Sequence, residues 1–340
     1  MREKFRPVQY LLFVAITCLV ALVCVCVGSV GVSPTDTFRT FWAALAGHPL
    51  PPGTSSSILL SVRLPRVLCV ALVGASLSLC GGAMQGLLRN PLADGSTLGV
   101  SSGASLGAVL AIAFGMQIPG LPGSGTMGMS ILFAFLSLLS ILALANRLDN
   151  SLSTNTIILI GVIFSMFSTS LISLVITFAG EKVRPIVFWT MGSLAGSTYS
   201  GALMLSVALL VCGIVIFLHR QELNAFSIGE ENAQHIGVNV RRVKLTILIA
   251  VSVLIGVCVS IGGTIGFVGL VIPHITRMLA GPNHKKLLPA SLFLGAIFLM
   301  LADLAARTVF SPRELPIGVV TSLIGAVAFV YIFHSTRKAR

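Results

Sequence analysis

Charged side chains are scarce in this sequence. Only 9% of its 340 residues are Asp, Glu, Lys or Arg, whereas 55% are hydrophobic. A water-soluble domain carries about 25% charged residues, so a chain this poor in charge cannot cover a surface that faces water. The composition therefore excludes an ordinary soluble domain and indicates a protein that is surrounded by lipid.

Acidic residues are fewer than basic ones, 10 against 22, which gives a net charge of +12. The basic residues lie in short clusters between apolar runs, which is typical of the positive-inside bias of membrane proteins. Binding of nucleic acid would need a basic face on a soluble domain, and no such domain is visible. We therefore expect a lipid bilayer as partner and no nucleic acid.

Motifs for catalysis and metal binding are also missing. The seven cysteines lie within apolar runs and lack the CxxC or Cys/His spacing of a metal site, so we expect them to be packing residues. No Lys follows a Gly, which excludes a P-loop, and no HExxH sequence occurs. The sequence predicts no enzymatic activity, no metal and no cofactor.

Long hydrophobic runs are abundant instead. The first run, Val8–Val30, follows Arg2, Lys4 and Arg6 and exceeds the roughly 7–15 apolar residues of a signal peptide, so we interpret it as a retained helix. A transmembrane helix needs about 20 mainly apolar residues. The ten predicted spans are residues 8–30, 64–88, 98–118, 127–146, 153–178, 199–218, 243–262, 264–280, 288–307 and 315–334, the eighth being short and rich in Gly.

The spans predict an all-α polytopic membrane protein that forms a single transmembrane domain over residues 1–340. With both termini in the cytoplasm, fifteen Lys and Arg residues lie inside, including Arg337, Lys338 and Arg340, and seven lie outside. Residues 219–242 form the longest cytoplasmic loop. Two halves of five helices would make an internal repeat inverted, as in many transporters.

Basic residues mark the predicted outer edge. Arg63 and Arg66 are three residues apart and share one face of a helix. They either extend toward lipid headgroups or bind acidic residues of an external partner, and the sequence leaves both open. Arg307 ends the ninth span, and Asp303 lies one turn earlier, so we predict that this acid and base pair with each other.

The cytoplasmic loop contains a short helical turn between two glycines. Acids at its start suit the positive end of a helix. The turn is either an ordinary surface helix or a coupling helix that fits a groove on a cytoplasmic ATPase. The candidate coupling residues are Gly229, Glu230, Glu231, Ala233, Ile236 and Gly237.

Hydroxyl side chains recur along the fifth span and in the tenth. They either line a polar pathway or hydrogen-bond neighbouring helices. The candidates are Ser165, Ser168 and Thr169, with Ser173 and Thr177 further along, and Thr321 with Ser322 in the tenth span. Buried acids are few, which argues against a secondary transporter, and no nucleophile–base set indicates an intramembrane enzyme.

Several motifs follow one another along the chain: Arg63-Leu64-Pro65-Arg66, Gly81 to Gly103 with Asn90-Pro91-Leu92-Ala93, Gly229 to Gly237, Gly263 to His274, Leu301-Ala302-Asp303 with Arg307, and Glu314 to Thr321. In this order they resemble the motifs of the FecCD-type permeases of ABC importers for iron-siderophores, haem and vitamin B12. The resemblance runs from about residue 60 to the end of the chain.

The resemblance implies ten helices per subunit in a bacterial inner membrane. It also implies a second permease copy or homologue, two cytoplasmic ATP-binding subunits and an extracytoplasmic substrate-binding protein. Arg63, Arg66 and Arg307 match arginines that form salt bridges with that binding protein, and the Gly229 to Gly237 loop matches the helices that contact the ATPase. The resemblance also implies that the cargo is a metal chelate, but it does not distinguish between an iron-siderophore, haem and cobalamin.

One segment departs from the family pattern. Residues Phe310-Ser311-Pro312-Arg313 place an extra Pro and an extra Arg beside the predicted docking surface. Arg313 would either add to the contact with the binding protein or take over part of the role of Arg307.

Overall fold

A computed structural model describes residues 5–28, 31–51, 54–95, 98–117, 119, 123–149 and 153–338. Over these ranges the chain is helical, and no strand occurs in them. Three residues of the predicted cytoplasmic basic clusters, Arg2, Lys4 and Arg340, lie outside the described residues.

Fifteen α-helices and two short turns of other helix types follow one another along the described chain. The α-helices are α1 (Pro7–Cys26), α2 (Pro34–Ala46), α3 (Thr54–Ser57), α4 (Leu64–Leu87), α5 (Val100–Ala113), α6 (Ser124–Leu148), α7 (Thr154–Phe178), α8 (Val183–Thr190), α9 (Tyr199–Leu218), α10 (Arg220–Phe226), α11 (Glu230–His235), α12 (Val240–Gly262), α13 (Val268–Ala280), α14 (His284–Thr308) and α15 (Ile317–Lys338). A π-helical turn, η1 (Ile58–Arg63), leads into α4, and a 3₁₀ turn, η2 (Gly180–Lys182), leads into α8.

Seven helices in the described part of the chain are long and apolar enough to cross a membrane: α1, α4 with the turns before it, α6, α7, α9, α12 and α14. The three remaining predicted spans coincide with shorter apolar helices, α5, α13 and α15. Every predicted span therefore corresponds to a helix, and the chain is a polytopic α-helical membrane protein.

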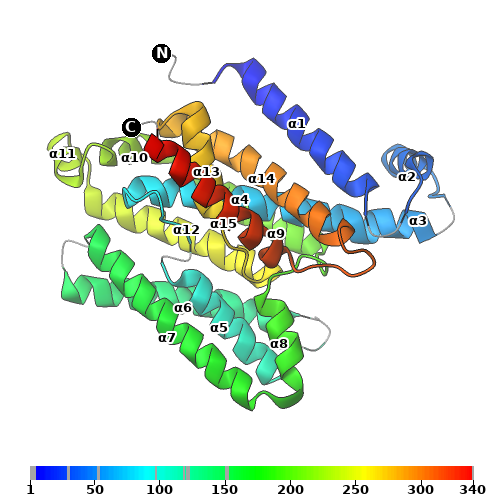
Figure 1. The fold of residues 1–340 in the computed structure, drawn as a ribbon, viewed down its shortest axis with the longest axis horizontal. Coiled ribbons are helices and arrows are strands. Elements are labelled where there is room, and N and C mark those ends of the chain that lie inside the picture. The colour runs from blue at the N-terminus through cyan, green and yellow to red at the C-terminus, as the bar shows by residue number, and fades with distance from the viewer. Residues whose placement is uncertain are drawn as a thin grey trace.

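The helices form two groups that α12 joins (Figure 1). One group contains α5, α6, α7 and α8, drawn in cyan and green in the lower part of the view. In the other group, α4 is the central helix, with α13 and α14 packed along it and α1 against α14. Most of α4 is buried, as expected for a helix enclosed by protein rather than lipid.

Glycines bring the helices around α4 into backbone contact. A Cβ atom on Gly81 would lie 1.8 Å from the carbonyl oxygen of Gly269 in α13, and one on Gly74 would lie 2.3 Å from that of Gly295 in α14. Small residues allow such close approach between membrane helices. Gly81 and Gly74 are therefore positions where α13 and α14 come into backbone contact with α4.

Two of the segments between predicted spans contain helices of their own. Residues 31–62 include α2, on which the exposed rings of Phe38 and Trp42 stack with centroids 6.4 Å apart. Residues 181–198 include α8. Aromatic side chains are enriched at membrane–water interfaces, so the position of α2 next to the end of α1 suits an interfacial helix (Figure 1).

Candidate functional site

Two of the predicted outer arginines, Arg66 and Arg307, form one ion network with Asp303 and Glu314. The third, Arg63, binds the same end of α1 as Arg307. We call Arg63, Arg66, Asp303, Arg307 and Glu314 the outer arginine cluster. Arg66 donates from Nε and Nη2 to Oδ1 of Asp303 at 3.0 and 2.9 Å, and from Nη1 to Glu314 at 2.8 Å. Oδ2 of Asp303 pairs with Nε of Arg307 at 3.3 Å, which confirms the predicted pairing of these two residues.

Two arginines of the cluster bind the end of α1. Arg63 donates to the carbonyl oxygens of Val25 and Cys26 at 3.0 and 2.8 Å, and Arg307 donates to that of Cys24. The last carbonyl groups of a helix have no partner within the helix and carry partial negative charge. The arginines therefore fasten α1 to α4 and α14.

Burial separates these arginines from the outer surface. Arg63, Arg66 and Arg307 expose only 4%, 6% and 2% of their surface. The side chain of Glu314 is 35% exposed, and its neighbour Arg313 is exposed. The structure thus brings the predicted arginines together but turns them inward, and Glu314 is the member of the cluster that reaches solvent.

On the opposite side of the protein, the predicted helical turn is present as α11 (Figure 1). Gly229 and Gly237 bracket it with φ angles of 117° and 92°, which L-residues with side chains rarely adopt. Ala233 is fully buried beneath the turn, whereas Glu231 is exposed. The glycines therefore define where the turn begins and ends, and Ala233 seats it on the protein.

Two apolar side chains flank this turn at the surface. Ile228 and Ile236 are 59% and 64% exposed. Glu231 and Asn232, within the turn, are exposed as well. The turn therefore presents both apolar and polar side chains to a potential partner.

Glu230 differs from its neighbour in the direction of its side chain. Its Oε2 accepts a hydrogen bond from Nζ of Lys244 at 2.6 Å, and its Oε1 accepts one from Oγ1 of Thr154 at 2.9 Å. Lys244, one of the fifteen basic residues predicted on the cytoplasmic side, is completely buried. Glu230 consequently connects α11 to α12 and to α7.

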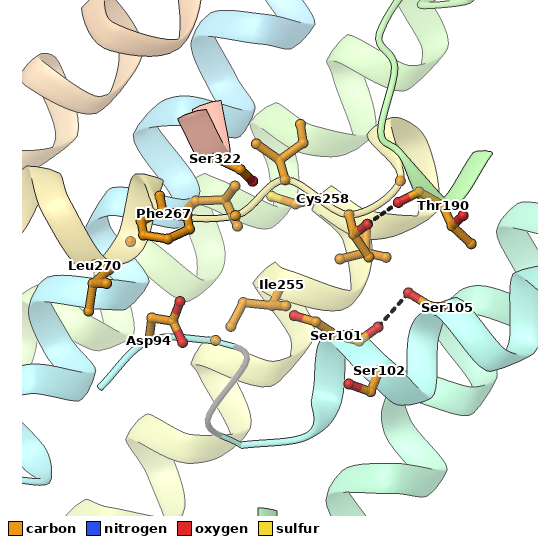
Figure 2. A pocket seen from close by; sticks show the side chains of 18 of the residues that line it. Asp94, Ser101, Ser102, Ser105, Thr190, Ile255, Cys258, Phe267, Leu270 and Ser322 are labelled. Carbon is orange, nitrogen blue, oxygen red and sulfur yellow. Dashed lines mark hydrogen bonds between the residues drawn. The ribbon is translucent and has the colours of Figure 1, made fainter. Parts of the chain in front are cut away.

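A cavity of about 530 Å³ lies between the two helix groups (Figure 2). Figure 2 shows Asp94 near Phe267 and Leu270, with the serines of α5 further along the same cavity. Apolar residues of α12 form part of its wall. The hydroxyl-bearing residues that line it are Ser101, Ser102 and Ser105 of α5, Thr169 of α7, Thr190 of α8, Thr264 of the loop before α13, and Ser322 of α15.

The predicted pathway residues divide between the cavity and the packed interior. Thr169 lines the cavity, and Ser322 does so rather than its neighbour Thr321, which is buried and donates to the carbonyl of Gly318 at 3.1 Å. Ser168 is fully buried, and its hydroxyl has no hydrogen-bond partner among the described residues. Ser165 does not line the cavity; its carbonyl accepts from Thr169 at 2.8 Å.

Sequence reasoning missed most of the cavity. The three α5 serines lie within and just after the stretch Gly81 to Gly103, which is a motif of the family resemblance and not one of the predicted pathway sites. Ser105 follows Ser102 by three residues and Ser101 by four, so it shares a helix face with each of them, a signal that the pattern does contain.

Phe267, the residue directly before α13, has a strained backbone conformation. Its φ angle is 68°, the left-handed region that residues other than Gly rarely occupy. A Cβ on Gly325 of α15 would lie 2.3 Å from the Cβ of Phe267, so α15 passes close beside this residue. The left-handed conformations of Phe267 and Gly263 explain why α13 starts at Val268, four residues after the start of the predicted span. Strain of this kind clusters at functional sites.

Comparison with known proteins places these features in a family. An ABC transporter permease of Bacillus subtilis, YvrB, is 43% identical over 322 residues, which cover 94% of this chain and 90% of that protein. The cobalamin import system permease BtuC of Halobacterium salinarum is 37% identical over 283 residues, 83% of this chain and 75% of its own. A solved inward-facing structure described as a metal-chelate type ABC transporter superposes with a TM-score of 0.84 at 33% identity, covering 97% of this chain and 100% of the other.

The FecCD transport family matches residues 14–335, nearly the whole described chain. The two sequence relatives above are named as permease proteins, and the solved structure as an ABC transporter. This chain therefore belongs to the FecCD transport family and is the membrane permease subunit of an ABC importer, not an enzyme.

Proposed function

We propose that this permease carries a metal chelate, an iron-siderophore, haem or cobalamin, from an extracytoplasmic binding protein into the cytoplasm. The observation that carries the proposal is the hydroxyl-lined cavity between the two helix groups. Relatives named for cobalamin, hemin and iron(3+)-hydroxamate import support this class of cargo. The pathway residues that line the cavity are Thr169 and Ser322, and Ser165, Ser168 and Thr321 lie on the same two helices, α7 and α15.

An oxyanion is the second candidate cargo, because a relative from Haemophilus influenzae is named for molybdate import. Oxyanions bind best to cationic or dense N–H donors. The described residues that line the cavity include one carboxylate, Asp94, and no Lys or Arg. This charge distribution favours a neutral or positively charged chelate over molybdate.

The binding protein docks at the outer arginine cluster. Arg63, Arg66 and Arg307 are the residues proposed for this contact, and their burial requires an exchange of partners. Arg66 is the best placed, because one of its two carboxylate partners, Glu314, is partly exposed. An acidic residue of the binding protein would replace Glu314 on Arg66, while Arg313 adds positive charge at the rim.

The ATPase binds at α11 and its flanking residues. Glu231 and Ile236 present the exposed contact, Ala233 seats the turn, and Gly229 and Gly237 shape it. ATP-driven closure of two ATPase subunits would move this turn and open the cavity alternately to the two sides. The complex would contain a second permease, as an identical copy or a homologue.

The same proposal includes the topology. One permease domain over residues 1–340 crosses a bacterial inner membrane ten times, as two inverted halves of five helices, with both termini in the cytoplasm. The coincidence of every predicted span with a helix supports this count.

Uptake by the reconstituted complex tests the cargo. The permease, its ATPase and its binding protein in proteoliposomes are offered cobalamin, haem, a ferric hydroxamate or molybdate, and ATP-dependent uptake of each is measured. We expect uptake of one of the three chelates and none of molybdate. Uptake of molybdate without any chelate would contradict the proposal.

A further inference from the structure

The Glu230 carboxylate lies where three helices meet. It belongs to the first residue of α11, Lys244 lies in the second turn of α12, and Thr154 is the first residue of α7. Its two oxygens are divided between these partners, Oε2 to Lys244 at 2.6 Å and Oε1 to Thr154 at 2.9 Å. A single side chain thus joins the cytoplasmic turn to two long helices.

The contact between Glu230 and Lys244 is a buried ion pair. Lys244 is completely buried, and the side chain of Glu230 is 22% exposed. A buried ammonium group is strongly unfavourable without a nearby carboxylate, so this ion pair resists separation when either helix moves. A displacement of α11 is therefore passed through Glu230 to α12.

The start of α7 is bound in the same way. Two carboxylates meet its first turn: Glu230 at Thr154, and Asp149, which accepts from the Ser153 amide at 3.1 Å and from Thr156 Oγ1 at 3.2 Å. The first turn of a long helix carries partial positive charge, which strengthens both contacts. Asp149 holds α7 from its own preceding loop, whereas Glu230 holds it from α11.

Motion at the start of α7 reaches the cavity. Thr169 lies fifteen residues after Thr154 on the same continuous helix, about 22 Å along its axis at 1.5 Å per residue. The other helix bound by Glu230, α12, supplies Ile255, Cys258 and Val259 to the cavity wall. Both helices that Glu230 joins therefore line the proposed pathway.

We propose that Glu230 is the internal joint that transmits the motion of α11 to α7 and α12, with Lys244 and Thr154 as positioning residues for transport. Glu231, exposed beside it, is left to contact the ATPase. The inference rests on the proposed role of the Gly229 to Gly237 loop as the ATPase contact. It goes beyond that proposed role because it assigns transmission of motion to Glu230 and contact with the ATPase to Glu231.

The experiment uses the full complex in proteoliposomes and measures two quantities for each variant: the affinity of the permease for its ATPase, and the amount of cargo moved per ATP hydrolysed. Glu230→Gln keeps the size and shape of the side chain but removes its charge. We expect unchanged ATPase affinity and about a tenfold loss of transport per ATP, within the usual range of coupling between distant sites. Glu231→Gln should do the reverse, with weaker ATPase binding and normal transport per ATP.

Thr154→Val tests the branch to α7 without disturbing the buried ion pair. It should reduce transport per ATP in the native background and have little further effect in the Glu230→Gln background, because the two residues act through one contact. Glu181→Gln, on the exposed outer turn η2, is the matched control for the loss of one carboxylate.

Three outcomes distinguish the possibilities. Normal transport per ATP in a folded Glu230→Gln complex would overturn the inference. Loss of ATPase affinity in Glu230→Gln would also overturn it, because Glu230 would then be an ordinary contact residue. If deletion of residues 230–236 left ATPase affinity unchanged, the proposed function of the loop itself would fail, whatever Glu230 did.

Discussion

Asp303 balances the charges of the outer arginine cluster. It is 1% exposed and pairs with both Arg66 and Arg307. Removing one partner of a buried ion pair leaves an uncompensated charge, at a cost of about 3–5 kcal/mol. Charge reversal at Arg66 would therefore disturb the fold as well as docking, and a test of docking has to act on a more exposed partner.

Glu314 is that partner. If an acidic residue of the binding protein takes its place on Arg66, Glu314→Gln removes a competitor, and we expect docking to tighten by about fivefold, in the range of a single charge contact at an interface. The dissociation constant of the detergent-solubilised permease with its binding protein, measured at low and high salt, checks this. Weaker docking by a variant with unchanged melting temperature would argue against the exchange.

The sequence reveals only the local half of this cluster. Asp303 and Arg307 are four residues apart on one helix, so their pairing follows from helical geometry alone. Arg66 is separated by 237 residues from Asp303 and by 248 from Glu314, and those contacts depend on how α4 packs against α14. For the same reason the sequence does not reveal that Lys244, predicted on the cytoplasmic side, is a buried partner of Glu230.

At the scale of helices, hydrophobic length is the strongest signal, and each predicted span corresponds to a helix. The signal fails for α2 and α8, which are too short or too polar to span and have to be found by other means. It also misplaces the start of α13, because strain at Gly263 and Phe267 depends on tertiary contacts with α8 and α15. Hydropathy detects segments that enter lipid, not those that lie along its surface.

Gly81 tests the close packing of α4 against α13. A Cβ there would overlap the backbone of Gly269, which cannot move as a flexible side chain does. We expect Gly81→Ala to destabilise the protein by about 1–3 kcal/mol, the usual cost of overpacking. The melting temperature in detergent is the measurement.

Gly128 on α6 provides the control. No atom lies within 4 Å of a Cβ built at Gly128, so Gly128→Ala adds the same methyl group in open space. It should leave the melting temperature nearly unchanged. Equal effects of the two substitutions would mean that α4 and α13 are not held in backbone contact.

At the scale of the whole molecule, the described part of the chain contains the cavity of the proposed pathway. The cavity lies between two helix groups that α12 connects, and Glu230 ties α11 to the helices on its walls. The sequence contains no P-loop, and the family relies on a separate ATPase. In the proposed function, the ATPase therefore drives the movement of cargo against a gradient through its contact with α11.

Uptake into proteoliposomes measures this directly. The permease is reconstituted alone with an imposed proton or sodium gradient, and in parallel with its ATPase, its binding protein and ATP. We predict that chelate accumulates against its gradient only in the complete, ATP-supplied system. Uphill accumulation by the permease alone, driven by an ion gradient without nucleotide, would contradict the account.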